Sequence, residues 1–128
     1  MRSLVLIADN DRTVNGLLRD VLVQRGLQVR QCFDGRAAMQ EGRAADVGVL
    51  VCDLDMPGAS GIEVLESLAD LAAPPPAVVV SGYLDAATRA RLQALPFVQA
   101  VLGKPFDLLA FADRVARLVA PATDSAGA

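Results

Sequence analysis

Polar side chains that can carry out chemistry follow the apolar segments of this sequence. Four such segments are followed by a polar residue: Asp9, Asp53, Ser81 and Lys104. Clustered carboxylate and carbonyl oxygens suit Mg²⁺, which keeps several waters and shares a substrate's phosphate oxygens. A carboxylate can also act as a nucleophile and form an aspartyl phosphate. Because phosphoryl transfer needs mainly in-line positioning and cancellation of charge, a metal, an ammonium and a hydroxyl are a sufficient set.

Several other chemistries are excluded by composition. The chain has no histidine, which removes Ser-His and Cys-His catalysis, imidazole zinc sites and a role as phosphohistidine donor. Its two cysteines, Cys32 and Cys52, lie in apolar segments without C-x-x-C spacing, so we expect buried reduced thiols. The net charge is −3, with no Lys/Arg cluster, which disfavours direct binding to nucleic acid or to anionic membranes.

The apolar segments are predicted β-strands. They cover residues 4–8, 27–33, 47–52, 77–80 and 100–102. The runs around Val49 and Val79 are nearly continuous, as expected for strands buried on both faces. Between the strands, apolar residues recur at helical spacing, for example at Val14, Leu18 and Leu22. Five strands alternating with five helices predict an α/β fold with a doubly wound parallel sheet covered on both faces.

In such a sheet, function collects at the carboxyl ends of the strands, so the four polar residues are expected on one rim. Each of them alone also fits a structural role. The cluster at residues 9–11 can cap a helix, Asp53 can open a turn, Ser81 can begin a loop, and Lys104 can be a solvated charge. Four such residues at the ends of four parallel strands favour a shared site.

The chain of 128 residues has room for one domain, which we place at residues 1–120, with a flexible tail at 121–128. No uninterrupted apolar stretch approaches the roughly 20 residues of a membrane span. The apolar run after Met1-Arg2-Ser3 is too short for a signal peptide. We therefore expect a soluble, cytoplasmic domain.

The sequence resembles the receiver domain of two-component response regulators over residues 3–119. The motifs that carry the resemblance are DN at 9–10, LVCDLDMPG at 50–58, VSGY at 80–83 and KPF at 104–106. The resemblance implies a CheY-like, flavodoxin-like (βα)5 domain with strand order 2-1-3-4-5. By the same resemblance, Asp53 is the phosphoacceptor, Ser81 the switch hydroxyl and Lys104 the partner of the phosphoryl group. The implied Mg²⁺ ligands are Asp9, Asn10, Asp53 and the backbone carbonyl of Asp55.

The function implied is that of a phosphoacceptor in a phosphorelay. A histidine kinase or histidine phosphotransfer protein would be the donor, and a conformational change would signal to a downstream protein partner. The domain would be a monomer or weak dimer, without direct contact to nucleic acid or membrane. It would not be an enzyme, apart from assisting its own phosphorylation and autodephosphorylation. The first helix is expected to present Asn15, Arg19 and Gln24 to the phosphoryl donor.

Two positions depart from the family pattern. Asn10 stands where the family usually has a second acid, and the helical stripe that begins at Val14 argues against a shifted register. Val101, three residues before Lys104, stands where many members carry Tyr or Phe. Valine has no ring to swing inward, so this position departs from the coupled aromatic switch that the resemblance implies.

Two alternatives are kept open. A pseudo-receiver would use the same fold only for docking, having lost phosphorylation through Asn10; the presence of Asp53, Ser81 and Lys104 argues against it. A haloacid-dehalogenase-type phosphohydrolase also uses Asp-x-Asp after a strand. It would have Thr or Val where Pro57 stands, and its Asp-x-Asp would open the chain rather than fall in the middle.

Overall fold

The computed structural model describes residues 2–127, with the side chains of 120–127 outside the described set. Strands and helices alternate along the whole chain. In chain order they are β1 (Leu4–Ala8), α1 (Arg12–Val23), β2 (Gln28–Cys32), α2 (Gly35–Glu41), β3 (Val47–Asp53), α3 (Gly61–Leu68), β4 (Ala77–Ser81), α4 (Ala86–Gln93), β5 (Val98–Gly103) and α5 (Leu108–Gly127). The predicted order of five strand–helix pairs is confirmed.

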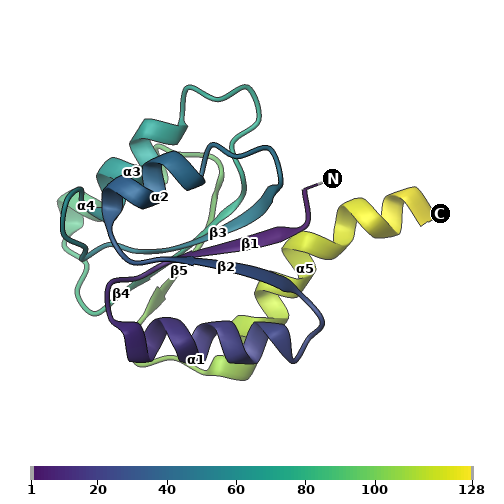
Figure 1. Cartoon of the computed structure of the whole chain (residues 1–128). Helices are drawn as coiled ribbons and strands as arrows, with labels where there is room; N and C mark the ends of the chain where they lie inside the picture. The colour runs from purple at the N-terminus through teal and green to yellow at the C-terminus, as the bar shows by residue number, and fades with distance from the viewer. Residues whose placement is uncertain (1, 128) are drawn as a thin grey trace.

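The strands form one parallel sheet in the order β2-β1-β3-β4-β5. Helices α1 and α5 cover one face, and α2, α3 and α4 cover the other (Figure 1). Strands β1, β3 and β4 are buried along their full length, because each lies inside the sheet and has helices on both sides. The doubly wound (βα)5, flavodoxin-like fold class is therefore confirmed.

Two apolar cores lie on the two faces of the sheet. Alternating residues of each strand point to opposite faces, so Val51 packs under α1 and α5 while Leu50 and Cys52 pack under α2 and α3. On α1, the inward residues Leu18 and Leu22 are fully buried. The burial of both strand faces explains the near-continuous apolar runs in the sequence.

Each helix is preceded by a short polar residue whose side chain accepts hydrogen bonds from backbone N–H groups left free in the first turn. The capping residues are Asp11, Asp34, Ser60, Asp85 and Asp107. Ser60 and Glu63 form a reciprocal capping box at the start of α3. Because each capping residue lies directly before its helix, it fixes the length of the loop between that helix and the preceding strand.

Helix α5 continues to Gly127, and the side chains of its last turns lie outside the described set. The predicted domain boundary at residue 120 and the flexible tail at 121–128 remain predictions. Among the residues that the structure describes, no helix is both long enough and apolar enough to cross a membrane.

Candidate functional site at the carboxyl ends of the strands

The sheet register places the predicted site residues at one edge. Ala8 at the end of β1 lies opposite Cys52 of β3. Asp53 ends β3, and Ser81 at the end of β4 lies opposite Gly103 of β5. Asp9 and Lys104 each follow their strand by one residue. Since parallel strands end at the same edge, four segments far apart in sequence meet there.

The structure brings Asp9, Asp53 and Lys104 together. The Nζ atom of Lys104 lies 3.3 Å from Oδ2 of Asp53 and 3.5 Å from Oδ2 of Asp9. Asp53 is 4% exposed and Asp9 is fully buried, while Lys104 is partly exposed. One ammonium group therefore faces two buried carboxylates, which leaves net negative charge at the rim.

The two carboxylates are held by backbone N–H groups of the loops that follow them. Oδ1 of Asp9 accepts from the N–H of Asp11 at 2.9 Å, and Oδ1 of Asp53 accepts from the N–H of Asp55 at 3.2 Å. Burial raises the pKa of the Asp9 carboxyl above its usual value, against the lowering effect of the Asp11 N–H; the charge of Asp53 also raises it, and Lys104 lowers it.

The other Asp9 oxygen, Oδ2, is a buried acceptor without a hydrogen-bond partner among residues 2–119. A buried carboxylate oxygen without a hydrogen bond is costly even with the Lys104 ammonium 3.5 Å away, and a further cation beside it would offset that cost. Within the described part of the chain, no three acidic or thiol side chains are grouped closely enough to hold a metal by themselves. The donor set of Asp9, Asp53 and a main-chain carbonyl nevertheless fits Mg²⁺, which keeps several waters and needs few protein ligands.

As far as the structure describes the chain, the side chains of two of the four residues predicted to bind the metal are held by no hydrogen bond, unlike those of Asp9 and Asp53. Asn10 and Asp55 are exposed, and among the described residues no hydrogen bond or ion pair joins either side chain to another group. Asn10 lies in the short link between β1 and α1, where Asp11 is the residue that caps the helix by accepting from Thr13 and Val14. A metal role for Asn10 and for the Asp55 carbonyl remains a prediction.

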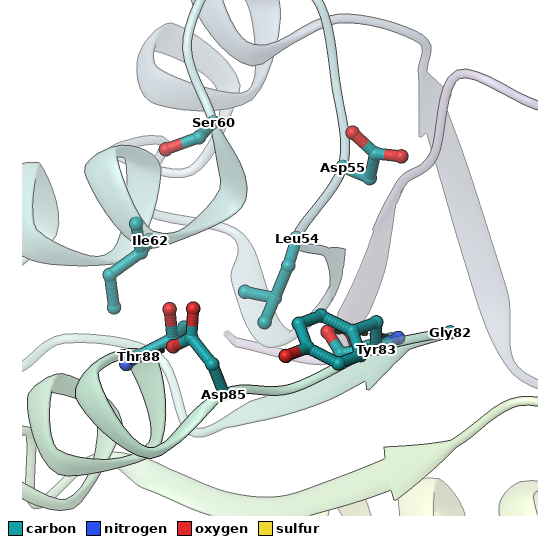
Figure 2. A pocket seen from close by; sticks show the side chains of 9 residues that line it. Leu54, Asp55, Ser60, Ile62, Gly82, Tyr83, Asp85 and Thr88 are labelled. Atoms are coloured by element: carbon teal, nitrogen blue, oxygen red, sulfur yellow. Dashed lines mark hydrogen bonds between the residues drawn. The ribbon is translucent and has the colours of Figure 1, made fainter.

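Ser81 is 6% exposed and bonds to its own loop. Its Oγ donates to the carbonyl of Tyr83 and accepts from the Tyr83 N–H at 3.1 Å. Beside it is a pocket of about 480 Å³, lined by the starts of α3 and α4 and by the loops that follow β3 and β4. Figure 2 shows Ser60 and Ile62 on one side, Asp85 and Thr88 on another, and Tyr83 at the loop after β4. The Ser81 hydroxyl thus lies at the same edge of the sheet as the acids, and both of its hydrogen bonds are with the backbone of Tyr83 in the loop after β4.

The prediction that the first helix exposes Asn15 is wrong. Asn15 is fully buried, because residues 15, 18 and 22 lie on one face of α1 and this face packs on the sheet. Arg19 and Gln24 are exposed as predicted. Sequence reasoning treated Asn15 as a surface polar residue, although its spacing from Leu18 and Leu22 is the signal that would have placed it inside.

Both cysteines are free and buried, as predicted. Burial raises the pKa of Cys32 to about 12 and raises the pKa of Cys52 as well. Neither thiol is therefore ionised near neutral pH, and neither takes part in the site.

Comparison with known proteins agrees with this geometry. The response regulator receiver domain family matches residues 5–116. The transcriptional regulatory protein FixJ of Azorhizobium caulinodans is 34% identical over 106 residues, covering 80% of this chain and 48% of that protein. A protein-glutamate methylesterase/protein-glutamine glutaminase of Burkholderia thailandensis is 30% identical over 125 residues, covering 90% of this chain and 34% of that protein. The chain thus spans about half or less of these curated relatives.

Solved structures show the same fold. The CheY-like receiver domain of Methanospirillum hungatei superposes with a TM-score of 0.86 at 16% identity, covering 98% of this chain and 99% of that one. The signal receiver domain of a LuxO repressor protein from Vibrio parahaemolyticus gives 0.85 at 18% identity, covering 98% and 95%. With the family match over most of its length and this strand order, the chain belongs to the receiver domain family of two-component response regulators.

Proposed function

We propose that this domain accepts a phosphoryl group on Asp53 from a histidine kinase or a histidine phosphotransfer protein. The observation that carries the proposal is the Asp53 carboxylate at the end of the central strand, buried beside Asp9 and 3.3 Å from the Lys104 ammonium. Receiver domains as a family act with histidine kinases and downstream effectors, which supports the same assignment. The domain turns over no external substrate in this proposal.

The transfer step uses Asp53 as nucleophile. An Asp53 oxygen forms a bond to phosphorus as the phosphorus–nitrogen bond to the donor's imidazole breaks, and the imidazole nitrogen keeps the electron pair. Lys104 cancels part of the charge on the phosphoryl oxygens, and the backbone N–H of Asp55 holds the carboxylate in place. Bound Mg²⁺, with Asp9, Asn10, Asp53 and the Asp55 carbonyl as its ligands, would supply the remaining positive charge.

The signalling step uses Ser81. Its hydroxyl exchanges the Tyr83 backbone for a phosphoryl oxygen once Asp53 carries the group. The loop after β4 loses two hydrogen bonds in that exchange and takes a new position. A protein partner that binds the new loop position then reads the phosphorylation state.

The decisive experiment is intact-mass spectrometry of the chain after incubation with acetyl phosphate and Mg²⁺. We expect one phosphoryl adduct in wild type and none in Asp53→Ala. Asp55→Ala is the matched control, because it removes an exposed acid two residues away and should keep the adduct. An adduct that survives in Asp53→Ala would overturn the assignment. A wild type that takes no phosphoryl group would favour the pseudo-receiver.

The donor protein is proposed to dock between α1 and the start of α5. An apolar groove of about 420 Å³ lies there, lined by Val14, Leu17, Leu18, Lys104, Pro105, Phe106 and Leu108. Leu17 is 50% exposed at its edge, and exposed Arg19 lies on the same helix. Because Lys104 belongs both to the groove and to the acid site, a protein seated here reaches Asp53.

Replacing Leu17 with Ala or Arg19 with Ala should slow phosphotransfer from a histidine kinase that phosphorylates the wild-type chain. The rate with acetyl phosphate should not change, since neither side chain contacts the acids. Gln24→Ala is the control and should leave both rates unchanged, because Gln24 is an exposed residue just after the end of α1 and does not line the groove. Equal losses with both donors would show damage to the site and contradict docking on α1.

A further inference from the structure

Asn15 is a fully buried polar residue whose three side-chain hydrogen bonds join α1 to the residue that follows β1 and to the end of β2. Its Nδ2 donates to the carbonyl of Asp9 at 2.9 Å and to the carbonyl of Cys32 at 3.0 Å. Its Oδ1 accepts from Nε2 of Gln31 at 2.8 Å. Since carbonyl oxygens only accept, the amide nitrogen must face the two strands, and the orientation of the side chain is settled.

These bonds act on the backbone on both sides of the Asp9 side chain. The N–H of Asp9 donates to the Cys32 carbonyl at 3.2 Å, and the C=O of Asp9 accepts from Asn15. With both flanking peptide groups held, the direction in which the Asp9 side chain leaves the backbone is fixed. The carboxylate itself has one hydrogen-bond donor, the Asp11 N–H, and its Oδ2 faces the partly exposed Lys104 ammonium at 3.5 Å without a hydrogen bond among the described residues. Its orientation therefore depends largely on how the backbone around Asp9 is held.

We infer that Asn15 is a positioning residue that aims the Asp9 carboxylate at the space beside Asp53 and Lys104. A buried amide is expensive unless its bonding groups are paired, and here the pairs lie at the carboxyl ends of β1 and β2, next to the acid. The inference rests on the proposed function in one respect: the oriented Asp9 carboxylate is taken to hold Mg²⁺ at the phosphorylation site. Groups that orient a metal ligand typically contribute about 10- to 100-fold to affinity.

The test compares Asn15→Leu and the milder Asn15→Ser with two control variants. Asn15→Leu keeps the size of the side chain and removes every hydrogen bond; Asn15→Ser is too short to reach both carbonyls. Gln31→Ala removes the donor to Oδ1, together with an exposed bond that Gln31 Oε1 accepts from Arg19 Nη1 at 3.4 Å, and leaves both Nδ2 bonds in place. Leu22→Ala is the control for lost stability: Leu22 is buried on the same helix away from the rim, so its loss destabilises the domain, as the Asn15 variants do, without removing a hydrogen bond.

Two NMR readouts are measured on each folded variant. The first is the chemical shift and hydrogen exchange of the Asp11 amide without Mg²⁺, because that N–H donates to Asp9 Oδ1 and reports the carboxylate's direction. The second is Mg²⁺ affinity from amide shifts. We expect both Asn15 variants to perturb the Asp11 amide, and Asn15→Leu to weaken Mg²⁺ about tenfold. Gln31→Ala and Leu22→Ala should keep both values.

The inference is overturned if the Asn15 variants keep the Asp11 amide and the Mg²⁺ affinity of wild type, or change them no more than Leu22→Ala does. The Asp11 amide is followed without metal or phosphoryl donor, so this outcome is independent of phosphorylation. Failure of wild type to take a phosphoryl group on Asp53 would instead overturn the proposed function, and the Asp11 result would still decide the role of Asn15.

Discussion

At the scale of single residues, the site is defined by an imbalance of charge. Two buried carboxylates, Asp9 and Asp53, share one ammonium from Lys104, and one Asp9 oxygen lacks a hydrogen bond in the described part of the chain. Burial raises the pKa of Asp9 because the ionised form is poorly solvated there. Two carboxylates and one ammonium leave net negative charge, which a bound cation would offset. The positive charge of that cation would in turn favour a phosphoryl group at the site.

The substitution Asn10→Asp would measure how strongly Mg²⁺ affinity depends on the number of carboxylates at the site. Replacing Asn10 with Asp adds a carboxylate at the mouth of the site. A net gain of about 1–2 kcal/mol, after the cost of dehydrating the ion, corresponds to about 5- to 30-fold tighter Mg²⁺ binding. Calorimetry or NMR shifts near Asp53 would measure it. Asp55→Asn should loosen binding modestly. Unchanged affinity in Asn10→Asp would mean that the metal does not contact position 10.

The residues predicted from sequence were those with a strong local signal. Asp9, Asp53, Ser81 and Lys104 each follow a strand, and strand ends are readable from apolar runs. The residue type of Asn15 alone predicts an exposed position, because asparagine is mostly found at protein surfaces. Only the packing of α1 against β1 and β2 provides the carbonyl oxygens that make its burial possible.

At the scale of elements, close contact between segments positions the site. The first residue of α3, Gly61, lies against the end of β3, so that an added Cβ would be 2.2 Å from the Asp53 carbonyl oxygen and 2.6 Å from the Leu54 Cα. No side chain fits between these backbones. The sequence predicts a turn here, but it could not predict how near α3 comes to Asp53, since that distance depends on the packing of the helix on the sheet.

Replacing Gly61 with Ala should therefore destabilise the domain by about 2–3 kcal/mol and move Asp53. Gly16→Ala is the matched control: Gly16 lies within α1 with no atom within 4 Å of an added Cβ. It should stabilise the helix by about 0.5–1 kcal/mol. Urea denaturation measures both. Equal stability of Gly61→Ala and wild type would contradict the close contact.

At the scale of the whole molecule, the fold was predictable because one pattern runs through the entire chain. Alternating strands and helices predict the parallel sheet, and continuous apolar runs predict burial on both faces. How a signal leaves the site was not predictable in the same way. Val101 lies on β5 in place of the expected aromatic residue, and the bonds between Ser81 and Tyr83 are a matter of loop geometry.

Those bonds make a whole-molecule prediction possible, because Tyr83 is the only tyrosine and the chain has no tryptophan. Tyr83 is 80% exposed beside the pocket between α3 and α4, so its emission reports the loop after β4 alone. Beryllofluoride with Mg²⁺, a phosphoryl mimic, should change tyrosine emission in wild type because Ser81 leaves the Tyr83 backbone. Asp53→Ala should show no change, which controls for quenching by the reagents. Ser81→Ala should still bind the mimic by mass yet keep its emission constant. A full change of emission in Ser81→Ala would show that the loop moves without Ser81 and would assign the signal to another part of the rim.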